Sequence, residues 1–326
     1  MQVSWLIPVR NGGELLQSAV DSAISECGPA DEVIVVDDGS TDGSVATLAH
    51  HKQLRCLQQA PKGIVAALEH GRKQARGELI ARLDSDDIAL PGRMRHQKRI
   101  LSAHPSTAAV GGRAQIHREN GPVSPGMLRY VAWLNGLQDL HSQRLIESPL
   151  FHPAVTLRAT AVEAVGGYEQ GDFPEDYDLW LRLIAGGWKL ENVSQEVVSI
   201  RDHDARLTRT DPRYSPSAFR RAKQRHLQAT LLNQPRRLVV WGAGRTGRPW
   251  IRWLLESGHS LEAIIDIGPG VSRQGVPIQP PSALPSLDFD LLLVAVGIPI
   301  ARQEIREALR DIRPDLVEGK NWWAIA

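Results

Sequence analysis

The sequence contains only two cysteines, Cys27 and Cys56, and this scarcity limits the chemistry that sulfur can perform here. Zinc sites and thiol nucleophiles need partner residues at characteristic spacings, and neither cysteine has such neighbours. Cys27 falls at the expected end of a helix and Cys56 on an expected strand. We therefore expect two reduced thiols, with a disulfide between them as the alternative.

Long apolar runs and a large net charge of either sign are also absent. No stretch reaches the roughly 18 apolar residues that span a bilayer, and the N-terminal start lacks the basic flank of a signal peptide. The formal net charge of +1 gives no support for a nucleic-acid-binding surface. These absences predict a cytoplasmic protein without a nucleic-acid partner, whose contact with membranes is at most peripheral.

Apolar strands and helical patterns alternate along the chain. The runs Val3 to Val9, Glu32 to Val36 and Glu78 to Leu83 are continuous and strand-sized, and segments of helical spacing separate them. Such a series is typical of an α/β fold with a parallel sheet covered on both faces. A break at Asn233-Gln234-Pro235 precedes a second strand–helix series. We therefore predict two α/β domains, at residues 1–233 and 234–326.

Three aspartates, Asp84, Asp86 and Asp87, directly follow the third of these strands. They emerge at the carboxyl edge of the sheet, where open α/β folds bind ligands. On extended backbone Asp84 and Asp86 share a face and Asp87 points elsewhere. Carboxylates this close repel one another unless a cation lies between them, and hard divalent cations take oxygen ligands. The cluster predicts a metal site, and the alternative is an acidic helix cap before Pro91.

Two other polar segments end strands at the same edge. Pro8-Val9-Arg10-Asn11 ends the first strand, and the segment from Asp37 to Asp42 ends the second. The carboxylate of Asp38 can accept hydrogen bonds from a base or a ribose, and the small residues after it let a nucleotide approach the backbone. The alternative role for Asp38 is to cap the helix that follows.

A third acidic segment, Glu175-Asp176-Tyr177-Asp178, opens a helix. A carboxylate at a helix start points out of the first turn and is stabilised as an anion by the helix dipole. That setting suits a general base that deprotonates a hydroxyl group. The alternative is again helix capping, which for Glu175 or Asp178 can be the whole role.

Taken in order, these segments resemble family 2 glycosyltransferases of the GT-A fold. The matching pieces cover most of the first 210 residues: IPVRN, EVIVVDDGSTD, KGIVAAL, GELIARLDSDDIALPGR, FHPAVTLR, VGGY and PEDYDLWLRL. The resemblance implies a Mn²⁺- or Mg²⁺-dependent transfer of sugar, with inversion, from a nucleoside-diphosphate sugar. A UDP-sugar is the favoured donor, and the acceptor is a hydroxyl of a glycan or a lipid-linked sugar. The Gln-x-x-Arg-Trp signature of processive synthases is absent, so we expect a non-processive enzyme.

By position, the resemblance also implies roles for individual residues. The nucleotide pocket would include Pro8, Asn11 and Asp38. Asp84 and Asp86 would form the Asp-x-Asp motif. Asp84 would contact both the donor and the metal, and Asp86 would be the principal metal ligand. The catalytic base would be Asp176, and His203 would lie near the metal or the diphosphate. His152 would line the acceptor side, with core packing as an equal alternative.

The second domain carries a glycine motif, Gly242-x-Gly244-x-x-Gly247, between a strand and a helix. Asp266 ends the next strand, where a ribose-binding acid would sit, so the pattern favours a nucleotide or a dinucleotide. The segment resembles the small Rossmann-like domains that precede some sugar acyltransferases. At about 90 residues it is only half of a full dinucleotide fold. We therefore favour a vestigial or regulatory nucleotide site, or a docking module, and the domain can also form an oligomer. The alternatives are a bifunctional enzyme with NAD-linked redox chemistry and a non-catalytic nucleotide-sugar-binding protein.

Overall fold

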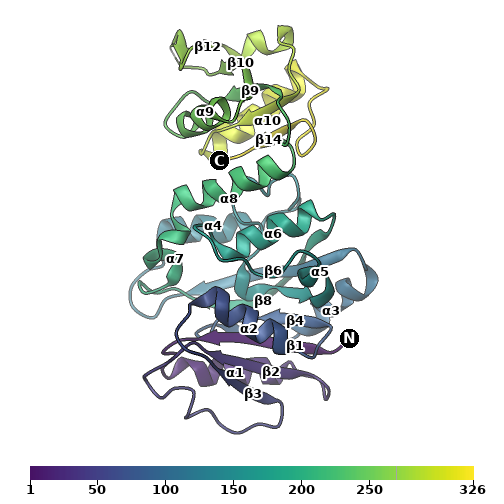
Figure 1. Cartoon of the computed structure of the whole chain (residues 1–326), viewed down its shortest axis with the longest axis vertical. Coiled ribbons are helices and arrows are strands. Elements are labelled where there is room, and N and C mark those ends of the chain that lie inside the picture. Colours follow the sequence, from purple (N-terminus) through teal and green to yellow (C-terminus); the bar gives the residue numbers. More distant parts are fainter. Residues whose placement is uncertain (269) are drawn as a thin grey trace. The chain divides into compact units, whose positions relative to one another are not determined.

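The computed structural model describes residues 1–268 and 270–326. The chain forms two compact units, and most of their helices and strands are labelled in Figure 1. Unit 1 contains Met1–Gln138 and Pro149–Ala222, and unit 2 contains Asp139–Ser148 and Lys223–Ala326. The units therefore differ from the ranges 1–233 and 234–326 by the segment 139–148 and by residues 223–233, which include the C-terminal part of helix α8 (Pro216–Ala229).

Unit 1 is built on one mixed sheet of eight strands in the order β3-β2-β1-β4-β7-β6-β8-β5. Strand β1 pairs in parallel with β2 and β4, and β2 pairs in parallel with β3, as the apolar runs predict. Strand β7 is antiparallel to both β4 and β6. The bounds are β1 (Val3–Val9), β2 (Glu32–Asp37), β3 (Leu54–Gln58), β4 (Leu79–Arg82), β5 (Ile88–Ala89), β6 (Thr107–His117), β7 (Thr156–Arg158) and β8 (Lys189–Arg201).

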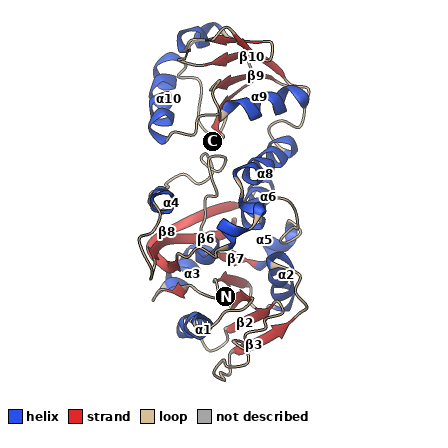
Figure 2. Cartoon of the chain, turned by 90° about the vertical axis from the view of Figure 1, so that its left-hand side faces the viewer, coloured by secondary structure: helices blue, strands red, loops and turns tan. Residues whose placement is uncertain are grey.

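Helices cover both faces of this sheet. Figure 2 shows α1 and α3 on one side of the strands and α2 and α6 on the other. Every residue of β1, β2 and β4 is buried, and each fully buried Val, Leu or Ile contributes about 1.5–3 kcal/mol to folding. The helix bounds are α1 (Leu15–Ser25), α2 (Ile64–Gln74), α3 (Arg93–Ala103), α4 (Pro125–Asn135), α5 (Ala159–Ala164), α6 (Glu175–Ala185) and α7 (Leu207–Thr210).

Unit 2 has its own sheet, in the order β11-β12-β10-β9-β13-β14. All neighbouring strands in it run parallel except β11, which is antiparallel to β12. Figure 2 shows α9 and α10 on opposite sides of this sheet. The bounds are β9 (Arg237–Trp241), α9 (Gly247–Glu256), β10 (Ser260–Ile265), β11 (Ser272–Arg273), β12 (Val276–Gln279), β13 (Leu291–Val294), α10 (Pro299–Ile312) and β14 (Trp322–Ala324).

The segment 139–148 had no clear pattern in the sequence, and the structure gives it a place in unit 2. The ammonium group of Lys223 donates hydrogen bonds to the carbonyls of Ile146 (2.8 Å) and Ile325 (3.2 Å). The guanidinium of Arg144 lies 4.0 Å from the ring centre of Trp323. These long-range contacts join the segment to the C-terminal strand of unit 2.

Two further expectations concern cysteine and membranes. Cys27 and Cys56 are both free thiols, and burial, with the nearby Asp31, raises the pKa of Cys27 to about 12. A thiol with so high a pKa is a poor nucleophile. Within the described ranges, no helix combines the length and the apolar character that crossing a membrane requires.

Candidate active site

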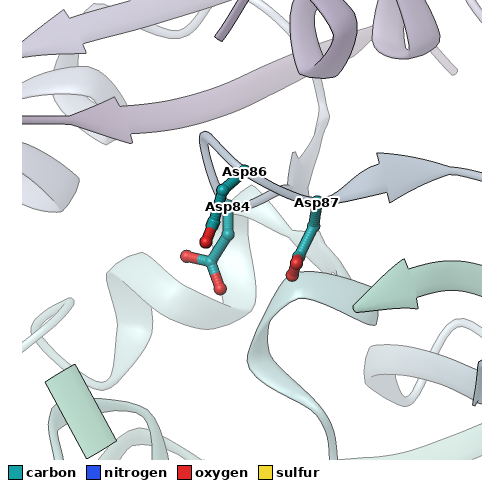
Figure 3. A group of neighbouring side chains, drawn as sticks. All are labelled: Asp84, Asp86 and Asp87. Atoms are coloured by element: carbon teal, nitrogen blue, oxygen red, sulfur yellow. The ribbon is translucent and has the colours of Figure 1, made fainter. Parts of the chain in front are cut away.

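The turn between β4 and β5 brings three carboxylates together. One oxygen each from Asp84, Asp86 and Asp87 lies within 4.8 Å of the other two, and Figure 3 shows all three side chains on the same side of the turn. The expectation that Asp87 points elsewhere was therefore wrong. It assumed extended backbone, whereas the chain turns here and the amide of Asp87 donates a hydrogen bond to the carbonyl of Asp84 (3.3 Å).

Each of the three carboxylates has a different environment. Asp84 forms an ion pair with the buried guanidinium of Arg82. Asp86 Oδ2 lies 2.8 Å from His203 Nε2. Asp87 is fully buried, and its Oδ1 accepts a hydrogen bond from the amide of Arg201 (2.8 Å). Its Oδ2 has no hydrogen-bond partner among the described residues.

The electrostatics of this carboxylate cluster favour a bound cation. Burial and the neighbouring Asp84 raise the pKa of Asp86, although Arg206 and His203 oppose the shift. Burial, together with Asp84 and Asp86, raises the pKa of Asp87 well above its ordinary value. A buried carboxylate oxygen without a partner is costly, and a hard divalent cation would relieve both this cost and the repulsion. The residues present therefore fit a divalent metal.

The alternative of a helix cap does not hold for this cluster. The helix after Pro91 is α3, and its N-cap residue Gly92 receives no side-chain cap from the aspartates. Its first amides are instead bound by Glu26, which accepts hydrogen bonds from Gly92 (2.7 Å) and Met94 (3.0 Å). The aspartates are thus not needed to start the helix.

The acidic residues at the start of α6 divide into two kinds. Glu175 and Asp178 are buried and bound: Glu175 accepts hydrogen bonds from the Tyr214 hydroxyl at 2.8 Å, and Asp178 accepts one from Arg182 Nε at 2.7 Å. Asp176 keeps part of its surface accessible, and its Oδ1 accepts a hydrogen bond from the next amide (2.7 Å). Burial of the group and the adjacent Glu175 raise the pKa of Asp176 to about 8. Of the three acids, Asp176 has the setting of a general base.

His152 lies behind this helix as a core residue. Its Nε2 is 2.9 Å from the Tyr168 hydroxyl, and its ring packs edge-on against Trp180. Burial and the positive charge of Arg82 hold the pKa of His152 well below its ordinary value, so the ring is neutral. The core-packing alternative therefore describes His152 in this structure.

The residues expected in the nucleotide pocket lie at the carboxyl ends of β1 and β2. Pro8 is buried in β1, and Asn11, which has a φ of 55°, accepts a hydrogen bond from the amide of Thr41 (2.8 Å). Asp38 accepts 2.8 Å hydrogen bonds from the amides of Lys62 and Gly63, and Gly63 is the N-cap residue of α2. Asp38 thus binds the start of α2, not a helix directly after it, and both polar side chains fix the loops that form this edge.

Comparisons with known proteins bear on this arrangement. Residues 4–166, half of the chain, match the family model described as Glycosyl transferase family 2. The chain belongs to this family. Both acidic segments predicted to carry its chemistry, after β4 and at the start of α6, lie in the unit that contains the match.

Relatives of this glycosyltransferase include three bacterial proteins that are named as glycosyltransferases. The amylovoran biosynthesis glycosyltransferase AmsE of Erwinia amylovora is 28% identical over 193 residues, which is 58% of this chain and 71% of AmsE. The putative glycosyltransferase EpsE of Bacillus subtilis is 27% identical over 223 residues, covering 66% and 78% of the two chains. An Escherichia coli UDP-Gal:alpha-D-GlcNAc-diphosphoundecaprenol beta-1,3-galactosyltransferase is 26% identical over 204 residues, covering 61% and 73%.

Solved structures show that the fold is GT-A. Residues 1–349 of S. aureus TarS, in complex with UDP-GlcNAc, align with a TM-score of 0.54 at 16% identity, covering 71% of this chain and 67% of that one. The mannosyltransferase PcManGT from Pyrobaculum calidifontis, in complex with GDP-Man and Mn²⁺, aligns with a TM-score of 0.50 at 18% identity, covering 78% and 68%.

The glycine motif of the glycosyltransferase's unit 2 has a structural explanation. A Cβ on Gly242 would lie 2.8 Å from the carbonyl oxygen of Ala295, and one on Gly247 would lie 1.8 Å from the carbonyl oxygen of Gly242. Gly244 has open space around its Cα and no such constraint. The first and third glycines are therefore required for the close turn between β9 and α9.

Asp266, the expected ribose-binding acid, is engaged by the backbone. Its Oδ2 accepts a hydrogen bond from the amide of Ala243 (2.6 Å), and its Oδ1 accepts one from the amide of Gly268 (2.8 Å). Oδ2 therefore helps to hold the glycine loop, and Oδ1 helps to hold the chain directly after β10.

Two residues that shape the glycosyltransferase site were not predicted from the sequence. Arg82 is a charged residue in the otherwise apolar strand Leu79–Arg82, and this break in the pattern was a usable signal. Tyr214 reaches Glu175 from 39 residues away, and no local pattern marks that contact.

Proposed function

We propose that this family 2 glycosyltransferase is a metal-dependent, inverting and non-processive enzyme that moves a sugar from a nucleoside-diphosphate sugar to a hydroxyl of a glycan or lipid-linked sugar. The observation that carries the proposal is the pairing of two acidic groups. One is a carboxylate cluster that needs a cation, with Asp87 Oδ2 buried and unpartnered in the described structure. The other is Asp176, a carboxylate suited to take up a proton.

Metal binding would involve Asp84, Asp86 and Asp87, with His203 in support through its contact with Asp86. Mn²⁺ or Mg²⁺ matches a donor set made of carboxylate oxygens. When bound, the ion would supply positive charge against the diphosphate leaving group. The complex of PcManGT with Mn²⁺ and GDP-Man supports this part of the proposal.

The donor would be a nucleotide sugar, with a UDP-sugar favoured. TarS is solved with UDP-GlcNAc, PcManGT with GDP-Man, and the Escherichia coli relative is named for UDP-Gal. We assign Pro8, Asn11 and Asp38 to the walls of the nucleotide pocket, because they shape the edge where β1 and β2 end. In this role Asn11 and Asp38 act by fixing backbone amides as well as through their own polar atoms.

Asp176 would accept the proton of the acceptor hydroxyl as that oxygen attacks the anomeric carbon. A base with a pKa near the working pH combines a useful ionised fraction with a strong pull on the proton. Direct attack from the face opposite the leaving diphosphate forms the new glycosidic bond as the old one breaks, so the configuration inverts. Lipid-linked acceptors are supported by the diphosphoundecaprenol acceptor in the name of the Escherichia coli relative.

The two units would correspond to a GT-A catalytic domain and a Rossmann-like accessory domain. The parallel order of β12, β10, β9, β13 and β14 supports the second assignment. We assign this unit a docking or oligomer-forming role, because Asp266 is committed to its own loop. No observation on the described residues favours NAD-linked redox chemistry there.

A thermal-shift screen of UDP-, GDP- and dTDP-sugars, each with Mn²⁺, Mg²⁺ or EDTA, tests the proposal. We expect one donor class to raise the melting temperature only when metal is present, because a ligand that binds the folded state stabilises it. A matched transfer assay with a lipid-diphosphate sugar acceptor should then release the nucleoside diphosphate. If no donor stabilises the protein in the presence of either metal, the proposal is wrong.

A further inference from the structure

The most exposed apolar side chains of the described residues all belong to unit 2. Among the large hydrophobic residues that the structure describes, the four with the greatest exposure are Ile267 (89%), Val271 (89%), Ile300 (73%) and Ile298 (64%). Single exposed apolar residues are normal on a protein surface, whereas a group of them marks an interaction site. Their position in the fold therefore decides whether they form one surface.

The strand register of unit 2 brings three loops to one edge of its sheet. Strands β9, β10 and β13 are parallel, and Trp241 at the end of β9 pairs with both Ile265 and Val294, the last residues of the other two. Because β9 lies between β10 and β13, the loops after these two strands start about 10 Å apart. We define the carboxyl edge of unit 2 as residues 242–248, 266–268, 270–271 and 295–300.

All four exposed aliphatic residues lie at this carboxyl edge. Ile267 follows β10 by two residues, and Ile298 and Ile300 flank the first residue of α10, in the segment that follows β13. The carbonyl of Val271 accepts a hydrogen bond from the amide of Ile278 (3.0 Å), near the end of β12, which runs parallel to β10. The aliphatic residues therefore stand on both sides of the glycine loop that follows β9.

The glycine loop adds positive charge between the two aliphatic groups. Arg245 in this loop and Arg248 in the first turn of α9 are both exposed. Among the residues that define the carboxyl edge, Asp266 is the only acid, and both of its oxygens accept hydrogen bonds from backbone amides. The edge is therefore an apolar and basic surface, and it offers no exposed carboxylate to repel an anionic partner.

We propose that the carboxyl edge of unit 2 binds the surface of a lipid bilayer that contains anionic lipids. Its aliphatic side chains would enter the boundary between head groups and acyl chains, while Arg245 and Arg248 would pair with lipid phosphates. The inference deepens the proposed function and rests on the docking role of unit 2 and on the lipid-linked acceptor, whose lipid part belongs in a membrane. An enzyme held at the bilayer meets such an acceptor at a raised local concentration.

The composition of the edge favours a bilayer over a second copy of the chain. The cores of protein interfaces are enriched in aromatic residues, whereas the large exposed apolar residues of this edge are all aliphatic. In a twofold dimer built on the same surface, Arg245 and Arg248 of one copy would face the same arginines of the other. Such like charges repel each other, whereas anionic lipid head groups complement them.

Vesicle flotation with the full-length protein tests the inference without donor, metal or acceptor. We expect wild type to float with vesicles of phosphatidylcholine and phosphatidylglycerol, and to bind pure phosphatidylcholine about tenfold more weakly. The variant Ile267→Ser/Ile298→Ser should bind the mixed vesicles at least roughly tenfold more weakly than wild type, because it removes apolar area that leaves water on binding. The variant Arg245→Gln/Arg248→Gln should lose the preference for the anionic lipid.

A double variant outside this edge is the matched control. Leu128 in α4 is 50% exposed, and Val317, which precedes β14 at the opposite edge of the unit 2 sheet, is 52% exposed. Leu128→Ser/Val317→Ser should bind vesicles as wild type does. All these side chains are exposed, so the melting temperatures of the variants should match wild type. If the serine variant of the edge does not fold, the arginine variant still decides through the preference for anionic vesicles.

Wild-type protein that floats with neither kind of vesicle would overturn the inference, and so would a control variant that loses as much binding as the edge variant. Sedimentation velocity without vesicles detects a second copy of the chain. A dimer that Ile267→Ser/Ile298→Ser converts to a monomer, in a protein that binds no vesicles, would assign the edge to self-association instead. Wild type that binds vesicles but releases no nucleoside diphosphate from any donor would contradict the proposed function and leave the membrane inference intact.

Discussion

His203 Nε2 lies 2.8 Å from Asp86 Oδ2, although 117 residues separate them in sequence. The contact joins the loop after β8 to the turn after β4, so a second segment of unit 1 contributes to the carboxylate cluster. Arg206, three residues later, also adds positive charge near Asp86 and Asp87. This loop therefore offsets part of the negative charge of the cluster in the structure described here.

Replacing Asp86 tests its assignment as the principal metal ligand. We expect Asp86→Asn to weaken Mn²⁺ affinity by at least roughly tenfold, since even supporting residues around a metal contribute 10- to 100-fold. Isothermal titration with Mn²⁺ in the presence of UDP measures the change. Asp288→Asn, at an exposed ion pair with Arg237 in unit 2, is the matched control and should bind Mn²⁺ as the wild type does. Equal affinities in the two variants would remove Asp86 from the ligand set.

We expect the native Asp87 to destabilise the folded protein when no metal is bound. It is 0% exposed and its pKa is raised in the folded protein, so the folded state holds its proton more tightly than the unfolded chain does. The ionisation of Asp87 therefore lowers the free energy of unfolding as the pH rises above about 3.9, the pKa of an aspartate in the unfolded chain. In EDTA at neutral pH we expect the free energy of unfolding of Asp87→Asn to exceed that of wild type by at least about 1 kcal/mol. Urea unfolding across pH 4 to 7 measures the gain, which should shrink toward acid pH.

Asp84→Asn is the matched contrast in the same turn. Asp84 balances the charge of Arg82, so its removal leaves a buried guanidinium without its ion pair. We expect a loss of about 2 kcal/mol, less than for a fully buried pair because Asp84 is 28% exposed. If Asp84→Asn and Asp87→Asn changed the free energy of unfolding in the same direction, the different roles assigned to these two aspartates would be wrong.

Much of this site could be predicted from the sequence because its parts are local. Continuous apolar runs gave β1, β2 and β4, and parallel strands bring their carboxyl ends to one edge. The position of Asp87 was predicted wrongly because the alternation of side chains holds only on extended backbone. The Tyr214–Glu175 contact and the packing of residues 139–148 depend on chain folding over long separations, which no local pattern records.

Asp176→Asn should abolish transfer while leaving donor binding intact. An asparagine has nearly the same shape but cannot accept the proton, and loss of a general base costs about 10²- to 10⁴-fold in rate. Donor affinity, measured by titration with metal present, should match wild type. Asp178→Asn should instead act through the loss of its ion pair with Arg182. Turnover close to wild type in Asp176→Asn would eliminate Asp176 as the base.

The same residue predicts how the wild-type rate depends on pH. Because the pKa of Asp176 is raised to about 8, the base is increasingly protonated as the pH falls below that value. We expect kcat/KM to decline toward acid pH along a single limb, and to reach a plateau on the alkaline side. A rate that is flat from pH 6 to 9 would show that another group accepts the proton.

Replacing Asp266 tests whether this residue of unit 2 has a structural role or binds a dinucleotide. Its two oxygens accept hydrogen bonds from Ala243 and Gly268, so Asp266→Ala should leave two amides unpaired and cost about 1–3 kcal/mol in stability. Glu262→Ala, at a half-exposed residue of β10 that bonds Ser260, is the control and should cost less. We expect NADH not to raise the melting temperature of the wild type, because both oxygens of Asp266 already bind backbone amides in a structural role. A metal-independent rise with NADH that Asp266→Ala abolishes would overturn the structural interpretation and restore a dinucleotide site.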